Sequence, residues 1–468
     1  MRTTPQSKEM VMASLLRLTA FSSVLVLLST GCPATREDSD VCRERLFFPS
    51  GMAVSPDESV LFVSNSNAEL RYNAGSVSVI DLDTIDTLID NWVQNGEAPG
   101  SCSRDLIVPG ALACEERAAM LLDGGVKIGN FSTALSVQEL ASGDLRLFVA
   151  VRGDPSITWI DYSSSARELS CTEDNAEVFP LCGSDNRLLH LRGDLELPEL
   201  VGEPFGMYVD SASGYVLVTH LALGAVTLID SPFDAVSGDP DRRPRLVDTV
   251  EGLFDINTST GVRAALGVAG RQPGTENDLI YVTSRSEDRV QMMSVYRGGV
   301  EPVLAVGEYF FMEGVAPSND ARGIAFNEDG SRLHIVNRLP AFMHVFDTED
   351  GPDGFPKNQF LGGVELCNEA SNIEVADLGR GDRAYITCFP NGQIWVADPR
   401  TQVIDSIIDV GRGPHAISLA KDRGRLYIAN FLEHTIAVVD IRPGSPTENR
   451  VVLRLGGLVD QNANCEDL

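Results

Sequence analysis

Positive charge is scarce in this sequence. Its 468 residues include 37 lysines and arginines against 67 aspartates and glutamates, which gives a formal net charge of -30. Affinity for nucleic acid comes largely from lysine and arginine side chains that displace counterions from phosphate groups. The composition therefore argues against a nucleic-acid partner. We attribute the acidity to solubility outside the cytoplasm; a cationic partner or bound divalent ions would be the alternative explanation.

The sequence also lacks the motifs of several common chemistries. It contains no H-E-x-x-H zinc site, no G-x-S-x-G nucleophile elbow and no C-x-x-C-H haem attachment site. The 6 histidines are scattered along the chain and do not suggest a convergent site. Two Asp/Gly-rich stretches, residues 327–330 and 350–354, lack the ligand spacing of an EF-hand and are typical of tight hairpin turns. We therefore predict no catalytic residue, no metal and no cofactor.

The apolar run at residues 24–28 is too short to span a bilayer. It follows basic residues and precedes the small residues 29–31, an order that is typical of a secretory signal. Together with Cys32, this segment resembles the lipobox of bacterial lipoproteins. The resemblance implies that residues 1–31 are a lipoprotein signal peptide, that Cys32 is lipidated and anchors the protein to a membrane, and that residues 32–45 form a tether. Ser29 departs from the pattern, which prefers leucine there, so simple secretion remains the alternative.

Pro33 stands where the resemblance would place an aspartate for retention in the inner membrane. We therefore expect an exported protein of the cell envelope, sorted to the outer membrane where the cell has two membranes.

Cysteine number supports the same compartment. Without Cys32, the 9 cysteines leave an even number that could pair in an oxidising environment. Proximity in sequence suggests three disulfides, and the remaining two cysteines would join the ends of the repeat region. The proposed pairs are Cys102 with Cys114, Cys171 with Cys182, Cys367 with Cys388, and Cys42 with Cys465. Other connectivities remain open, because eight cysteines allow 105 pairings.

A phrase of two consecutive β-strands recurs seven times along the chain. Its first strand alternates β-branched, aromatic and small residues, as expected of a pleated strand. Its second strand ends, in six repeats, on an aspartate whose carboxylate can accept backbone N–H groups two residues further on and start a turn. The first strands are residues 61–64, 147–150, 216–219, 280–283, 333–336, 384–387 and 426–429, and the closing residues are Asp81, Asp161, Asp230, Ser294, Asp347, Asp398 and Asp440.

Further strand-like segments flank each phrase and complete four strands per repeat. Tandem four-stranded units without a convincing helical period predict an all-β fold, a seven-bladed β-propeller of antiparallel blades over residues 46–457. Residues 458–468 would be a C-terminal tail that carries the ring-closing Cys465. Long loops are expected at residues 91–140, 162–200 and 231–275.

Two repeats carry the segments Gly51–Asp57 with Phe62–Asn65, and Tyr427–Asn430 with Thr435–Asp440. These segments resemble the YVTN-type β-propeller repeats, closely in the first and last two repeats and loosely in the middle. The resemblance implies the ring fold, but it says little about function, because the same ring hosts binding proteins, enzymes and cofactor domains.

Equivalent positions after the first strand of each phrase would lie at one rim of the ring. This candidate ligand face would suit an anion or a peptide, although asparagine is also common in left-handed turns there. Its polar and basic members are Asn65, Arg152, His220, Arg285, Asn337, Arg338 and Asn430. Arg322 and His415 occupy matching places before innermost strands and form a second candidate, at the channel mouth; hydrogen-bonded loop residues would be the plainer interpretation.

These observations favour a monomeric, lipid-anchored propeller that binds a protein, peptide or glycan without catalysing a reaction. The main alternative is a hydrolase of lactonase type, which would need three or four carboxylates and asparagines at one channel mouth. A purely structural envelope component is the third interpretation.

Overall fold

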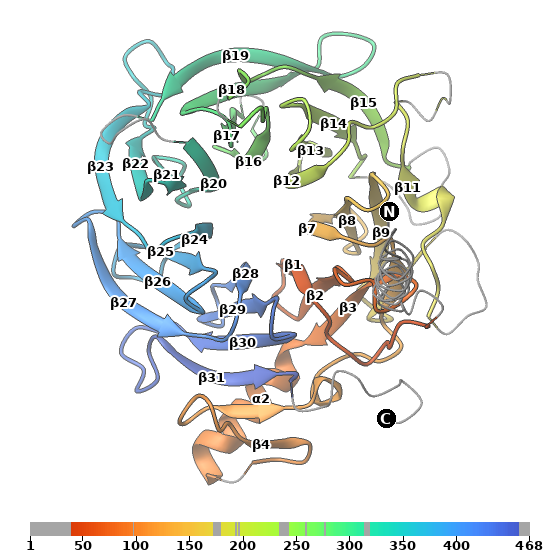
Figure 1. Ribbon diagram of the computed structural model, residues 1–468, viewed down its shortest axis with the longest axis vertical. Helices are drawn as coiled ribbons and strands as arrows, with labels where there is room; N and C mark the ends of the chain where they lie inside the picture. Colours follow the sequence, from red (N-terminus) through yellow and green to blue (C-terminus); the bar gives the residue numbers. More distant parts are fainter. Residues whose placement is uncertain are drawn as a thin grey trace, which may run out of the picture.

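The computed structural model describes residues 39–457, except residues 97, 172–178, 192–193, 195–196, 234–242, 258–259, 276–277 and 313–318. Seven β-sheets are arranged in a ring, each with its first strand nearest the centre (Figure 1). The chain is a seven-bladed β-propeller, as the repeats predict. No helix within the described ranges is long and apolar enough to cross a membrane.

The blades follow one another in chain order. Blade 1 contains β1 (Pro49–Val54), β2 (Val60–Asn65), β3 (Gly75–Asp81) and β6 (Val126–Ile128). Blade 2 contains β7 (Ser132–Glu139), β8 (Leu145–Val151), β9 (Ser156–Ser163) and β10 (Glu168–Ser170), with β11 (Arg187–Leu188) paired to β9. Blade 3 contains β12 (Pro204–Asp210), β13 (Tyr215–His220), β14 (Val226–Asp230) and β15 (Arg245–Val250).

The other four blades have the same order from the channel outward. Blade 4 contains β16 (Ala265–Gly270), β17 (Ile280–Ser284), β18 (Arg289–Tyr296) and β19 (Val303–Phe311). Blade 5 contains β20 (Asn319–Phe326), β21 (Arg332–Leu339), β22 (Ala341–Asp347) and β23 (Gln359–Glu365). Blade 6 contains β24 (Ala370–Asp377), β25 (Asp382–Cys388), β26 (Gln393–Asp398) and β27 (Val403–Asp409). Blade 7 begins with β28 (Pro414–Ala420), β29 (Arg425–Asn430), β30 (Thr435–Asp440) and β31 (Arg450–Leu455).

The recurring two-strand phrase forms the second and third strands of every blade. The second strands β2, β8, β13, β17 and β29 are buried along their whole length, because neighbouring blades cover both faces. The closing aspartates play the predicted turn role in three blades. Asp347, Asp398 and Asp440 accept the backbone N–H two residues on at 3.0, 2.9 and 3.1 Å.

Every innermost strand carries a register irregularity near its start. Four of the seven irregularities contain a glycine, because the backbone of the next blade approaches closely there. A Cβ on Gly206 would lie 2.4 Å from the carbonyl oxygen of Leu266. The freed N–H is held by a hydroxyl of the second strand, as Thr219 Oγ1 accepts from Gly206 at 3.0 Å. Residues within these irregularities line the central cavity.

Blade 1 contains a long insertion between β3 and β6 that closes the ring. It holds α2 (Leu82–Asn95), β4 (Cys102–Arg104), β5 (Leu112–Cys114) and the short helix η1 (Glu116–Ala118). β5 pairs in parallel with β31, so blade 7 becomes a six-stranded sheet. The sequence shows no convincing helical period, yet this insertion contains the 14-residue helix α2. Asp81 does not only close a strand; its carboxylate also caps α2 by accepting the N–H of Thr84 at 3.1 Å.

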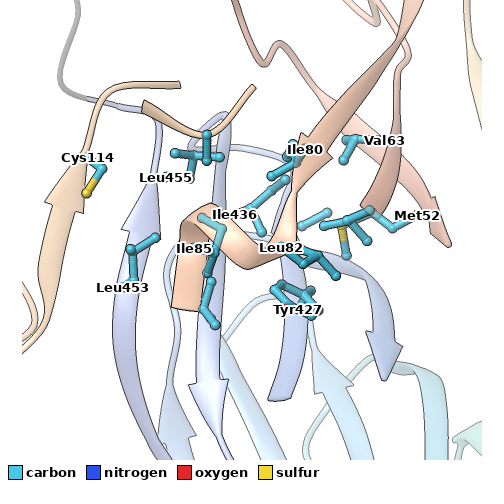
Figure 2. Packing of buried hydrophobic residues seen from close by; sticks show 14 of the residues in the cluster. Met52, Val63, Ile80, Leu82, Ile85, Cys114, Tyr427, Ile436, Leu453 and Leu455 are labelled. Atoms are coloured by element: carbon cyan, nitrogen blue, oxygen red, sulfur yellow. The ribbon is translucent and has the colours of Figure 1, made fainter. Parts of the chain in front are cut away.

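Apolar packing holds this insertion on blade 7. Leu82, Ile85 and Ile89 form one buried stripe of α2 at helical spacing. Figure 2 shows Leu82 and Ile85 beside Ile436, Tyr427 and Leu453 of blade 7. At about 1.5–3 kcal/mol for each fully buried aliphatic side chain, the stripe stabilises the docked helix by several kcal/mol before conformational entropy is counted.

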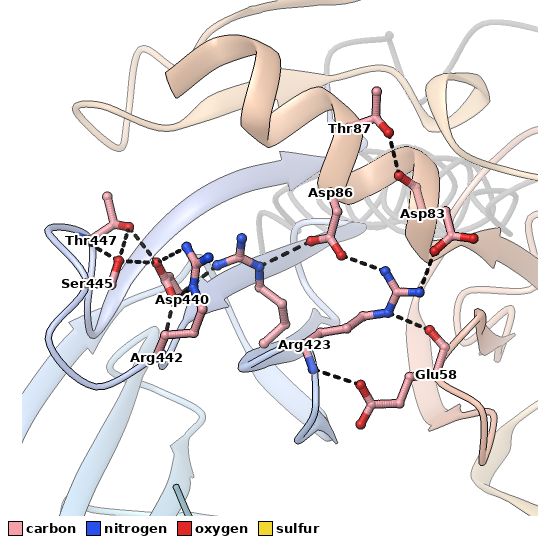
Figure 3. A network of polar contacts seen from close by, with 10 residues as sticks. Glu58, Asp83, Asp86, Thr87, Arg423, Asp440, Arg442, Ser445 and Thr447 are labelled. Carbon is pink, nitrogen blue, oxygen red and sulfur yellow. Dashed lines mark hydrogen bonds and ion pairs between the residues drawn. The ribbon is translucent and has the colours of Figure 1, made fainter. Parts of the chain in front are cut away.

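Ion pairs also hold helix α2 on blade 7 (Figure 3). Arg423 contacts Asp83 at 2.6 Å and Asp86 at 2.5 Å, and its backbone N–H donates to Glu58 at 2.9 Å. Asp440 accepts hydrogen bonds from Arg442, Thr447 and Ser445, which lower the pKa of its carboxyl although burial opposes the shift. The contacts of Arg423 tie blade 1 to blade 7, whereas those of Asp440 hold a loop within blade 7.

The three disulfides expected from sequence proximity are present: Cys102–Cys114, Cys171–Cys182 and Cys367–Cys388. Disulfides of this kind are typical of a protein that folds in an oxidising compartment. Cys32 and Cys465 lie outside the described residues. Part of the predicted tether is packed into the fold, since Val41 and Cys42 are buried with Phe47 and Phe48.

Candidate functional site

The central channel contains a cavity of about 460 Å³ that all seven innermost strands line. This volume lies within the range of small-ligand pockets. We call the end of the ring at which the innermost strands begin the top face, and the other end the bottom face. The described lining residues are 50–52, 133–136, 205–207, 266–268, 322–324, 371–374 and 415–417, with Arg338, Glu369 and Phe389 at the top.

The charged residues of the cavity lining are concentrated on one side of the channel. All of its formally charged residues, Arg322, Arg338, Glu369 and Glu374, belong to blades 5 and 6, and His415 follows on blade 7. Blades 2, 3 and 4 contribute mainly apolar residues, among them Leu135, Phe205 and Met207. The innermost strands β7 and β12 face β24 across the ring (Figure 1). One side of the channel is therefore polar and the opposite side apolar.

Three arginines and two carboxylates meet at the top of the polar side. Arg322 forms a forked ion pair with Asp320, with Nε 2.6 Å and Nη2 2.9 Å from the two carboxylate oxygens. Arg285 lies 3.6 Å from the same carboxylate. Arg338 contacts Glu369 at 3.4 Å and donates to the hydroxyl of Ser371 at 3.2 Å. These five groups leave one positive charge in excess.

The positive charges of the three arginines at this mouth repel one another. Burial and the neighbouring charge of Arg322 lower the pKa of Arg338 below its ordinary value, and Arg285 adds to the effect. The Nε atom of Arg338 is buried without a hydrogen-bond partner among the described residues. An anion placed here would offset the repulsion and supply the missing acceptor.

His415 is neutral at pH 7. Its Nδ1 lies 2.9 Å from the carbonyl oxygen of Ser50, and because a carbonyl can only accept, Nδ1 carries the proton and Nε2 is left as an acceptor. Burial lowers the pKa of the ring, and the charges of Arg322 and Arg338 lower it further. Asn372 donates to the carbonyl of His415 and fixes the start of β28.

Glu374 is the feature of the channel that sequence reasoning missed. It makes no hydrogen bond or ion pair with any of the described residues, and burial raises its pKa to about 7. It stands opposite Tyr385 in the blade register. The equivalent residues of the other innermost strands are Ala53, Ser136, Tyr208, Ala269, Ala325 and Ser418. Aligning the innermost strands would have shown that Glu374 is the only carboxylate among these seven residues.

The asparagines and the histidine of the predicted ligand face do not form such a face. Asn65, His220, Asn337 and Asn430 are completely buried. Asn65 accepts the N–H of Phe47 at 3.1 Å, and Asn430 donates to the carbonyl of Val410 at 2.8 Å. Burial lowers the pKa of His220 to about 4. These side chains point into their own blades because they hold neighbouring backbone.

Residues at or near the end of a blade's second strand share a structural role. His220 Nδ1 lies 3.3 Å from the carbonyl of Gly202, and Ser284 donates to the carbonyl of Ala264 at 3.1 Å. In each case the partner belongs to the segment that leads into the same blade's innermost strand. Blade 6 makes the corresponding tie covalently, through Cys367–Cys388. Asn337 instead holds its hairpin, through the carbonyl of Pro340 at 2.7 Å.

The rim arginines tie neighbouring blades together. Arg152 pairs with Glu203, Arg285 with Asp320, and Arg338 with Glu369, in each case from one blade to the segment that starts the next. Only Arg338 of these three arginines lines the cavity. The structure thus brings Arg322, Arg338 and His415 together at the channel mouth, and it places Arg152 outside the channel.

A second cavity, of about 590 Å³, lies on the bottom face between blades 5 and 6. Its carboxylates are engaged in local structure: Asp377 accepts three loop N–H groups at 2.7–3.0 Å, and Asp398 contacts Arg383 at 3.4 Å. Across the described residues no group of three or more histidines, cysteines and carboxylates is arranged to hold a metal ion.

Comparison with known proteins yields the fold and nothing finer. No family model matches this chain, and no curated protein sequence does. A protein of Bacteroides fragilis that is proposed to be a 6-phosphogluconolactonase is similar in structure, with a TM-score of 0.52, 13% identity, and coverage of 86% of this chain and 98% of that one. The β-propeller domain of Cps50 (Swd1) from Myceliophthora thermophila gives a TM-score of 0.51, 10% identity, and coverage of 85% and 98%. A periplasmic gluconolactonase of Pseudomonas aeruginosa gives 0.49, 14%, and coverage of 77% and 84%.

Proposed function

We propose that this protein is an exported, lipid-anchored propeller of the cell envelope that binds a protein, peptide or glycan with its top face. The anchor would be Cys32, with the outer membrane as the destination. The observation that carries the binding role is the concentration of charged groups at one mouth of the channel, opposite an apolar wall. Such convergence of a few polar groups on an otherwise apolar concave surface is what binding sites share.

The proposed role is tested by comparing the two faces. Fluorescently labelled protein is applied to arrays of peptides and glycans, and the bound members are measured again with charge-reversal variants. Arg285→Glu combined with Arg338→Glu alters the top face, and Lys421→Glu combined with Arg400→Glu is the matched change on the bottom face. We expect the first pair to abolish binding and the second to leave it intact. Equal losses from both pairs would contradict the proposal.

Hydrolysis of a lactone is the second candidate, and Glu374 favours it. An unpaired carboxylate with a pKa of about 7 suits a general acid or base at neutral pH. With Glu369 and Asn372 it gives the channel the three carboxylate and asparagine side chains that this alternative requires. Glucono-δ-lactone hydrolysis faster than the spontaneous rate, and lost in Glu374→Gln, would establish the enzyme and overturn the non-enzymatic role.

A further inference from the structure

We propose that the top of the channel is a site for a single carboxylate attached to an apolar group. The inference rests on the proposed binding function and names the ligand chemistry at the same face. The acid would lie between Arg322 and Arg338, and its apolar part would extend toward Phe205 and Met207 on the opposite wall.

Charge favours a monoanion. Arg285, Arg322 and Arg338 face Asp320 and Glu369, so the mouth holds one positive charge more than it neutralises. One carboxylate balances this excess, whereas a phosphate dianion would leave a net negative charge in a confined space. The Glu374 carboxylate deeper in the same cavity adds to the disadvantage of a second negative charge.

Donor geometry favours a carboxylate. Arg322 directs Nε and Nη2 at Asp320, and its Nη1 makes no hydrogen bond or ion pair with any of the described residues. Arg338 makes its contacts through Nη2, and its buried Nε lacks an acceptor within the described part of the chain. Guanidinium groups bind planar carboxylates through such paired N–H donors. Both arginines line the cavity, and each carries an N–H group without an acceptor among the described residues.

The opposite wall selects for an apolar neighbour of the acid. Phe205 and Met207 are partly exposed to the channel, and Leu135 lies beside them in the lining. At the mouth, Phe389 adds an aromatic ring to the polar side. A hydrocarbon or aromatic group next to the carboxylate would bury its surface there. A small organic acid and the C-terminus of a peptide both have this chemistry.

Calorimetric titration of the full-length purified protein with matched acids and amides tests the inference without any mutation. The probes are hexanoate and hexanamide for small acids, and N-acetyl-Gly-Phe with a free carboxylate or a terminal amide for peptides. We expect at least tenfold tighter binding of an acid than of its amide, the loss typical of a missing charge-assisted hydrogen bond. Tighter binding of hexanoate than of hexanamide would indicate small acids as ligands. A preference for the acid that occurs only in the N-acetyl-Gly-Phe pair would indicate peptide C-termini.

Arg338→Gln should remove the preference for the acid, and Arg338→Lys should restore part of it. The matched control is Arg152→Gln, because Arg152 occupies the same position in blade 2, pairs with Glu203 in the same way and does not line the cavity. Phe205→Ala should weaken acid and amide by equal factors. Equal binding of acids and amides by the wild-type protein would overturn the inference, as would an equal loss in Arg152→Gln. If array binding at the top face persists in that case, the proposed function stands and only this ligand chemistry fails.

Discussion

Replacing Glu374 by glutamine should stabilise the protein at neutral and alkaline pH. In the folded chain, burial raises the pKa of this carboxyl from 4.5 to about 7. Below pH 4 the group is protonated in both the folded and the unfolded state, so it costs nothing. As the pH rises from 4.5 to 7 the unfolded chain ionises first, and stability falls; above pH 7 the loss is constant.

The size of the effect follows from the same values. Raising a carboxyl pKa from 4.5 to about 7 disfavours its ionised form by about 3 kcal/mol, at 1.36 kcal/mol for each pH unit. Part of the side chain contacts the channel, so solvent screening makes about 3 kcal/mol an upper figure. The free energy of unfolding of wild type and Glu374→Gln is measured by denaturant titration from pH 4 to pH 8. Equal stabilities at pH 8, or the same difference at pH 4 and pH 8, would refute the reasoning.

Two further substitutions test the buried ties and the ring closure. Asn430→Ala leaves the carbonyl of Val410 without its donor. We expect denaturant titration to show a loss of about 1–3 kcal/mol in the free energy of unfolding, with unchanged binding of the acid probes. Weakened probe binding would mean that Asn430 does face the ligand. Replacing Cys102 and Cys114 together by serine removes the disulfide between β4 and β5, which should cost about 3 kcal/mol and speed amide exchange in β31. Unchanged exchange in β31 would show that the added strands do not protect the edge of blade 7.

The ring itself was predictable from the sequence because each blade repeats one local pattern. Second strands buried on both sides require apolar and small residues at fixed positions, and the closing aspartates mark their hairpins. Helix α2 escaped prediction because its apolar stripe of Leu82, Ile85 and Ile89 occurs only once, inside an insertion. A segment that occurs only once cannot be recognised by comparing the repeats with one another.

The candidate site was only half predictable. Sequence position placed Arg322 and His415 at the mouth, where both lie in the first half of an innermost strand. The sequence could not show that the side chains of Asn65 and Asn430 are buried in their own blades. An asparagine can hydrogen-bond to a ligand or to neighbouring backbone equally well. Nor could the sequence distinguish Arg338 from Arg152, whose sequence settings match and whose difference lies in how far each reaches toward the channel.

The pairing of β5 with β31 has a consequence for how the chain matures. Blade 1 supplies the strands that finish blade 7, yet it is made several hundred residues earlier. While the chain is being completed, the insertion must stay with the edge of β5 unpaired until β31 is made. A chain that is cut short before residue 450 would keep both edges open, and we expect such products to aggregate or be degraded rather than persist as partial rings.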